Sequence, residues 1–110
     1  LEFMQDALVG LGLIDEEDAK SQDASKPLVK KYFMHGTSHH IGLDVHDVSP
    51  FNEPFAVGQV LTIEPGIYIR EENLGCRIEN DVQIRENENF DLMANIPIEA
   101  DEIEALMAGV

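Results

Sequence analysis

The four histidines of the chain lie in one short segment, HGTSHHIGLDVHD, at residues 35–47. Histidine is the commonest metal ligand and is well placed for proton transfer near neutral pH, although it also serves as an ordinary half-buried polar residue. His35 and His39 have the spacing of a zinc-binding HExxH helix, but no glutamate lies between them, and Gly, Thr and Ser are poor helix formers. The segment therefore indicates metal or acid–base chemistry on irregular backbone.

Two glutamates further along the chain could supply carboxylate ligands. Glu64 follows the apolar stretch VLTI and precedes a Pro-Gly pair, and catalytic side chains often emerge at a strand end beside a turn. Glu79 lies within the strand-like stretch CRIENDVQIR. Taken singly, each has a simpler explanation: Glu64 as an outward-facing strand residue, and Glu79 as a cross-strand partner of Arg77 or Arg70.

Histidine and two strand-borne carboxylates together form a mixed nitrogen and oxygen donor set. Such a set suits Mn, Fe, Co or Zn better than a metal that prefers thiolates. A hydrolytic two-metal centre needs about five or six protein donors to hold ions roughly 3.5–4 Å apart. The chain offers three convincing donors, so its residues alone support only part of such a centre.

The residues before the histidine segment predict two helices. The first ends near residues 10–12, and Asp15 is a suitable N-cap for a second helix that runs to about Ser21, before a break at Pro27. The apolar stripe expected on the first helix consists of Phe3, Ala7, Leu8 and Leu11. Because this helical pattern is already under way at Leu1 without a capping residue, we expect the chain to be cut from a longer protein.

The middle of the chain predicts strands. Irregular backbone from Tyr32 should run into a strand, because β-branched residues follow the histidines, and residues 50–58 should form a loop. GQVLTIEPGIYIR predicts two extended stretches around a Pro-Gly turn, and the turn EENLG leads to CRIENDVQIR, expected as one alternating strand in an antiparallel pair. The residues expected on one face of that strand are Arg77, Glu79, Asp81 and Gln83.

The tail returns to a helical pattern. Ile103, Leu106 and Met107 form an apolar patch at helical spacing, and acidic residues are concentrated in the first turn. Helices and strands are thus expected in separate stretches, which indicates the α+β class. A length of 110 residues allows one domain at most.

Charge and composition limit the classes of partner that the chain can bind. A formal net charge of −15 opposes binding to nucleic acid or to an anionic membrane surface, so a neutral or cationic partner is expected. No apolar run approaches the roughly 20 residues of a membrane span. The single cysteine, Cys76, cannot form an internal disulfide, which favours a reducing cytoplasmic setting with this residue as a small apolar filler.

Three motifs then resemble a known family. HGTSHHIGLDVHD, TIEPGIYI and GCRIENDV are similar, in this order, to the metal-site motifs of Xaa-Pro aminopeptidase (aminopeptidase P), one of the pita-bread metallopeptidases, which include prolidase, methionine aminopeptidase and creatinase. The resemblance runs from about Tyr32 to Arg85, and the tail is similar to the family's closing helix. It implies the C-terminal half of a pita-bread fold, with an antiparallel curved sheet and flanking helices.

The resemblance implies a metal ligand set. His39 would ligate a metal, Glu64 would be a carboxylate ligand near the nucleophilic water, and Glu79 would bridge two ions. The ions would be two divalent metals, expected to be Mn²⁺, with Zn²⁺ or Co²⁺ as alternatives. Bound water would then ionise near pH 7 and attack the peptide bond between an N-terminal residue and a following proline.

The resemblance also implies supporting residues. His35 and His46 would contact the substrate, position the scissile carbonyl and shuttle a proton, so that with Glu64 they form the catalytic set. Arg77 would orient the bridging carboxylate by charge-assisted hydrogen bonds. His40 has no implied role.

One departure limits what the chain can do alone. The family uses two further metal-ligating aspartates on strands before the first motif, whereas the aspartates before His35 lie in helical, surface-like contexts. We therefore expect residues 1–110 to be the C-terminal portion of a single catalytic domain, without a normal dinuclear site or activity by itself. A lesser departure is Asn80, where an acid often follows the bridging glutamate.

Three alternatives stay open. The chain could be a non-catalytic pita-bread binding module, a prolidase-type dipeptidase with the same metal chemistry, or a small stand-alone metal-binding β protein. As a peptidase, the full-length protein is expected to act on peptides with proline in second position and to be a homo-oligomer.

Overall fold

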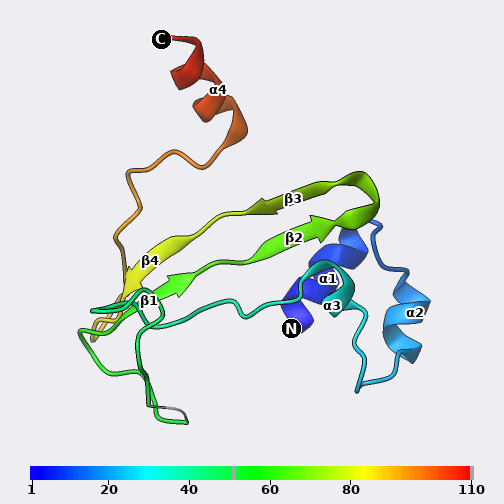
Figure 1. Ribbon diagram of the computed structural model, residues 1–110, viewed down its shortest axis with the longest axis horizontal. Coiled ribbons are helices and arrows are strands. Elements are labelled where there is room, and N and C mark those ends of the chain that lie inside the picture. The colour runs from blue at the N-terminus through cyan, green and yellow to red at the C-terminus, as the bar shows by residue number, and fades with distance from the viewer. Residues whose placement is uncertain (51, 110) are drawn as a thin grey trace. The chain divides into compact units, whose positions relative to one another are not determined.

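The computed structural model describes residues 1–50 and 52–109, and the chain divides into two compact units. The first unit comprises Leu1–Gly36 and Pro65–Arg77, and the second comprises the described parts of Thr37–Glu64 and Ile78–Val110. Helices and antiparallel strands occupy separate stretches, which confirms the α+β class (Figure 1). Among the described residues, no helix has the length and apolar character needed to cross a membrane.

The helices of the first unit follow local sequence signals. They are α1 (Glu2–Gly10), α2 (Glu16–Ser21) and α3 (Val29–Tyr32). The Asp15 carboxylate accepts hydrogen bonds from the backbone N–H groups of Glu17 and Asp18 at 2.8 and 3.2 Å, which confirms the predicted N-cap of α2. α3 is a single turn after Pro27, where only a break was predicted.

The buried face of α1 differs from the predicted stripe. Leu8 is fully buried and Met4 nearly so, whereas Phe3 is 82% exposed and Leu11 is 63% exposed. Met4 and Leu8 lie one helical turn apart, so they share the face that packs in the core, and Leu11 already lies past the helix end. The core of this unit consists of Met4, Leu8, Ile14, Ala19, Val29, Tyr32 and Phe33.

An antiparallel hairpin completes the first unit. β2 (Gly66–Ile69) pairs with β3 (Leu74–Arg77), and the two run side by side in Figure 1. The turn between them contains the short 3-10 helix η1 (Arg70–Glu72) and Asn73 at φ 51°, a left-handed conformation that asparagine tolerates well. This confirms the predicted turn and antiparallel pairing.

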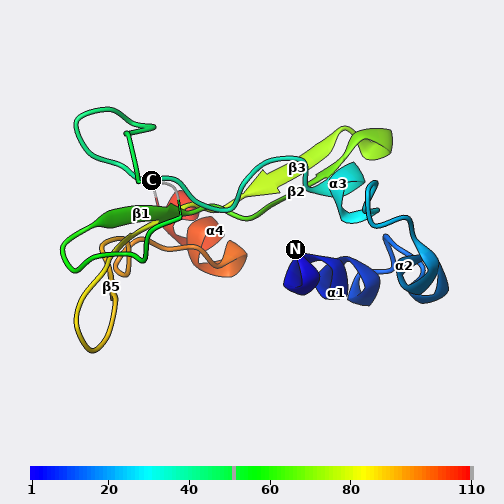
Figure 2. The same ribbon diagram turned by 90° about the horizontal axis from the view of Figure 1, so that it is seen from below.

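The second unit holds a three-stranded sheet. β1 (Val60–Ile63) and β5 (Phe90–Asp91) lie on either side of β4 (Asn80–Gln83). Figure 2 labels the two outer strands, β1 and β5. The prediction of one continuous strand over 76–85 is wrong, because β3 and β4 belong to different sheets and residues 78–79 between them are unpaired in the ladders. Opposite this interruption lies Pro65, which has no N–H to donate to a ladder.

The histidine segment is not a strand either. It forms an isolated bridge between His40 and Leu61, and beyond His40 it turns back, with the Asp47 N–H donating to the His40 carbonyl at 3.1 Å. Gly42 fits here because a Cβ atom at this position would collide with the Asp47 carboxylate. The β-branched residues that suggested a strand, Val45 and Val48, are exposed instead.

Two further expectations concern exposed residues. The helix α4 (Ala100–Ala108) confirms the helical pattern predicted for the tail, and the patch residues Ile103, Leu106 and Met107 are 39%, 58% and 73% exposed. Cys76 is exposed, so its interpretation as a buried filler is wrong. Strand β3 leaves its side chains exposed along its whole length, which accounts for this.

An ion pair between α3 and the hairpin turn predicts a pH effect. Lys31 Nζ donates to Glu71 Oε1 at 2.8 Å, which lowers the pKa of Glu71 below its ordinary 4.5 and raises the pKa of Lys31. The Glu71 contribution to stability is therefore present above its unfolded-state pKa and is lost as the pH falls through the lowered folded-state pKa. The Lys31 contribution is lost only at strongly alkaline pH.

We expect Glu71→Gln to lower the melting temperature slightly at pH 7, because both side chains are more than half exposed. The difference in melting temperature between the variant and the wild type should shrink in high salt and vanish as the pH falls well below 4.5. Thermal melts across this pH range measure it, with Glu72→Gln as a control of equal charge change. An effect of equal size at pH 2 and pH 7 would contradict the ion-pair explanation.

Candidate metal centre

The structure brings three of the predicted site residues together. His39, Glu64 and Glu79 each offer a ligand atom, and these atoms lie within 4.8 Å of one another. We call these three residues the donor group; all belong to the second unit. Within the described part of the chain, this is the one cluster of at least three histidine, cysteine or acidic residues with metal-ligand spacing.

Strand β1 places two members of the donor group. Glu64 directly follows β1, and its N–H donates to the Thr37 carbonyl at 2.8 Å. Two residues earlier, the Thr62 N–H donates to the His39 carbonyl at 2.9 Å. These bonds hold the histidine segment alongside β1, so residues far apart in sequence lie side by side. Glu79 directly precedes β4, the neighbour of β1 in the sheet.

Hydrogen bonding defines how the His39 ring is protonated. Its Nδ1 lies 2.9 Å from the His40 carbonyl, which can only accept, so Nδ1 carries a hydrogen. The other ring nitrogen, Nε2, lies 3.2 Å from Glu64 Oε1. In a neutral ring this nitrogen is also an acceptor, so two acceptors face each other. A positive charge between them, either a proton on Nε2 or a metal ion, would stabilise this contact.

The donor group fits a divalent metal. Two ligands with bonds of about 2.0–2.2 Å to one ion in tetrahedral geometry are separated by ~3.3–3.6 Å. The 3.2 Å between His39 Nε2 and Glu64 Oε1 is close to this range. Their side chains are 18% and 12% exposed, and Glu79 is exposed, so two donors are held rigidly and the third can adjust.

His46 lies next to the donor group without belonging to it. Its ring stacks on the His39 ring with 4.1 Å between ring centroids and 17° between planes. The loop that turns back at Gly42 produces this contact. The structure therefore places His46 beside the donor group, and its proposed role in contacting substrate stays a prediction.

Three further predicted or considered residues are not members of the donor group. His35 and Arg77 belong to the first unit, where Arg77 ends β3. His40 packs edge-on against the Phe55 ring, with 6.0 Å between ring centroids, and is not a member of the donor group. The catalytic role of His35 and the orienting role of Arg77 stay predictions.

His35 has a hydrogen-bonding partner that sequence reasoning missed. Its Nδ1 lies 2.6 Å from the Gly36 carbonyl and therefore carries the hydrogen, so Nε2 accepts from the Tyr68 hydroxyl at 2.8 Å. The Tyr68 ring lies close over Gly66 and Gly75, since a Cβ atom at either glycine would meet it at 2.8–2.9 Å. Small residues on the hairpin thus allow Tyr68 to reach His35.

We expect Tyr68→Phe to change which nitrogen of the neutral His35 ring carries the hydrogen, without unfolding the first unit. The tyrosine hydroxyl favours the neutral ring with its hydrogen on Nδ1, and phenylalanine retains the packing over the glycines. Nitrogen-15 NMR of the imidazoles distinguishes the two neutral forms and the doubly protonated ring, with His35→Gln to assign the signal. Identical His35 spectra in wild type and variant would show that the hydroxyl has no influence.

Asn80 and Thr62 complete the surroundings of the donor group. The Asn80 amide donates to Asp91 Oδ2 at 2.7 Å, so this hydrogen bond joins β4 to β5. Thr62 was not identified from the sequence, although strand alternation places it on the same face as Glu64. That alternation was the signal that could have found it.

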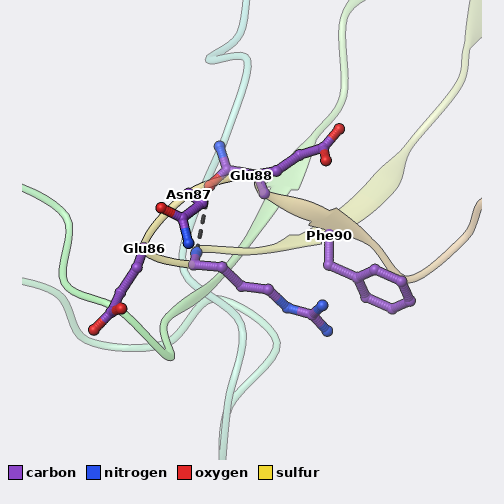
Figure 3. Close-up of a pocket in the computed structure, with 6 residues that line it drawn as sticks. Glu86, Asn87, Glu88 and Phe90 are labelled. Carbon is purple, nitrogen blue, oxygen red and sulfur yellow. Dashed lines mark hydrogen bonds between the residues drawn. The ribbon is translucent and has the colours of Figure 1, made fainter.

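A hollow lies in the loop at residues 85–90 and contains no comparable donor group. Figure 3 shows the side chains of Glu86 and Glu88 pointing in different directions around this loop. The Arg85 guanidinium lies over the Phe90 ring, 4.1 Å from its centroid. Arg85 is the one cationic residue that lines this hollow, and it is thus already in contact with an aromatic side chain. The chemistry of the described residues is therefore concentrated in the donor group.

Comparison with known proteins defines the class. Residues 3–86 match metallopeptidase family M24, and the chain belongs to this family. It is 40% identical to the Xaa-Pro aminopeptidase of Escherichia coli over 96% of this chain and 26% of that protein. It is 37% identical to human Xaa-Pro aminopeptidase 3 over 90% of this chain and 21% of that protein.

Solved structures agree with this assignment. Zinc-substituted aminopeptidase P of Escherichia coli in complex with product matches with a TM-score of 0.79 and 38% identity, over 96% of this chain and 26% of that chain. The resemblance to aminopeptidase P and its pita-bread fold is thereby confirmed. The chain spans about a quarter of the length of these relatives.

Proposed function

We propose that this chain forms part of the metal centre of an Xaa-Pro aminopeptidase, which hydrolyses the bond between an N-terminal residue and a following proline. Membership of metallopeptidase family M24 and the names of the relatives support the proposal. The observation that carries it is the contact of His39 Nε2 with Glu64 Oε1 at 3.2 Å, with Glu79 near both. The net charge of −15 is compatible with cationic peptide N-termini.

The donor group would hold the metal. His39, Glu64 and Glu79 would ligate two divalent ions, with Glu79 as the bridge and Mn²⁺ as the expected metal, Zn²⁺ or Co²⁺ being alternatives. When bound, such ions polarise a carbonyl and supply hydroxide at neutral pH. The His40 carbonyl keeps the His39 hydrogen on Nδ1 and so presents the Nε2 lone pair, as ligand partners commonly do.

The remaining residues would act on the substrate. His46, stacked on His39, and His35, held by Tyr68, would position the scissile carbonyl and move the proton to the leaving proline nitrogen. Glu64 would lie near the attacking water, and Arg77 would orient Glu79. The net charge of −15 opposes nucleic acid as a partner.

Residues 1–110 would be the C-terminal portion of one catalytic domain. The donor group supplies three ligands, fewer than the about five or six that a dinuclear centre needs. The 110-residue polypeptide alone should therefore neither hold two ions tightly nor cleave peptides. A cytoplasmic location and a homo-oligomeric full-length protein also stay predictions.

Metal content and peptide cleavage test the proposal together. We expect the whole encoded protein to hold two divalent ions after dialysis and to cleave Xaa-Pro peptides longer than dipeptides, with loss of both on chelation. The 110-residue polypeptide, assayed in parallel, should show neither property. A whole protein without bound metal and without cleavage would favour a non-catalytic binding module, and cleavage of dipeptides alone would favour a prolidase.

A further inference from the structure

We propose that Thr62 is a positioning residue that holds two metal ligands, His39 and Glu64, in one hydrogen-bonded arrangement. This inference rests on the proposed function, because it concerns the same donor group. Thr62 is fully buried in β1. Its hydroxyl lies 3.0 Å from the His39 backbone nitrogen and 3.1 Å from Glu64 Oε1.

The direction of each hydrogen bond follows from the groups involved. The His39 N–H can only donate, so the Thr62 hydroxyl accepts there. The hydroxyl has one hydrogen of its own, and Glu64 Oε1 at 3.1 Å is a closer acceptor than the His39 carbonyl at 3.5 Å. That carbonyl already accepts the Thr62 N–H at 2.9 Å. The hydroxyl therefore links the backbone of one ligand to the carboxylate of the other.

This link acts on the oxygen that faces the metal position. Glu64 Oε1 is both the atom that Thr62 contacts and the atom 3.2 Å from His39 Nε2. With the hydroxyl in place, the Glu64 carboxylate is oriented before a metal arrives. Threonine suits this position because a β-branched side chain has few χ1 rotamers and fits a strand. Loss of the hydroxyl would leave the His39 N–H without this acceptor and remove one of the contacts that orient the Glu64 carboxylate.

Four variants of the whole encoded protein test the role of the hydroxyl. Thr62→Val keeps the shape and removes the hydroxyl, Thr62→Ser keeps the hydroxyl, and Thr62→Ala lacks both hydroxyl and methyl. Thr37→Val is the matched control, because it removes an exposed hydroxyl in the same unit and keeps the backbone carbonyl that accepts the Glu64 N–H. Affinity for Mn²⁺ is measured by competition with a chelator, and the visible absorption of the Co²⁺-loaded protein reports the ligand geometry.

We expect Thr62→Val to weaken Mn²⁺ binding by roughly 10–100-fold and to shift the Co²⁺ spectrum, as loss of a group that orients a metal ligand commonly does. Thr62→Ser and Thr37→Val should bind about as tightly as the wild type. If Thr62→Val does not fold, Thr62→Ala and Thr62→Ser decide the question, since both lack the methyl group and differ in the hydroxyl.

Equal Mn²⁺ affinity in Thr62→Val and the wild type, with an unchanged Co²⁺ spectrum, would overturn the inference. So would a loss in Thr62→Ser as large as that in Thr62→Val or Thr62→Ala. Either result leaves the proposed function intact, because the wild type still binds metal. A wild-type protein that binds neither ion would instead refute the proposed function, and with it the inference.

Discussion

Replacement of His39 by alanine is expected to abolish tight binding of divalent metal by the whole encoded protein, whereas replacement of His40 by alanine should leave binding unchanged. His39 presents Nε2 to Glu64 at 3.2 Å, and alanine removes this donor completely. Loss of a residue that orients a metal ligand commonly weakens metal affinity by roughly 10–100-fold. Loss of a direct ligand should weaken it by at least roughly a hundredfold. Cleavage of Xaa-Pro peptides should fall to background.

The neighbouring histidine makes this a closely matched comparison. His40→Ala removes the same side chain one residue away, in a contact with the Phe55 ring and outside the donor group. The hydrogen bond from His39 Nδ1 to the His40 carbonyl is retained, because it involves the backbone. Metal content after dialysis and chelator competition measure both variants. Equal losses in His39→Ala and His40→Ala would indicate a general disturbance of the segment rather than removal of a ligand.

Replacement of Glu79 by glutamine is expected to lower the metal content of the whole protein from two ions to one and to remove activity. A carboxylate can bridge two ions through its two oxygens, whereas glutamine has one oxygen and an NH₂ group that donates hydrogen bonds and repels a cation. Glu79 is the exposed member of the donor group, so the substitution should change folding stability little. Elemental analysis of the dialysed protein measures the stoichiometry.

Glu86→Gln provides the control for charge. Glu86 is exposed in the loop drawn in Figure 3, and its substitution removes the same single charge from the second unit without touching the donor group. It should retain two ions and full activity. Retention of two ions in Glu79→Gln would show that this residue is not the bridge, even if activity fell.

Several elements were predictable because their causes are local. The N-cap of α2 depends on Asp15 and the two residues that donate to it, all within four positions. The β2–β3 hairpin depends on alternation and on a turn with Asn73 in a left-handed conformation. Such signals lie within one stretch of sequence, so they can be recognised without knowledge of the rest of the fold.

The sequence-based predictions were wrong where contacts between residues distant in sequence determine the structure. CRIENDVQIR alternates as one strand should, yet its first part pairs with β2 and its last part with β1. Pro65, between β1 and β2, has no N–H to donate to a ladder. On α1, the helical pattern does not say which of its apolar residues face the core, and Met4 is buried where Phe3 was expected. In both cases the deciding contact lies outside the stretch that carries the pattern.

The sequence by itself determined the α+β class and the family, and its three ordered motifs named the members of the donor group. Only the tertiary structure decided that His46 stacks on His39 and that Thr62 contacts both His39 and Glu64. The physical reason is separation along the chain: the hydroxyl and the His39 N–H are 23 positions apart, and only the pairing of β1 with the histidine segment brings them together.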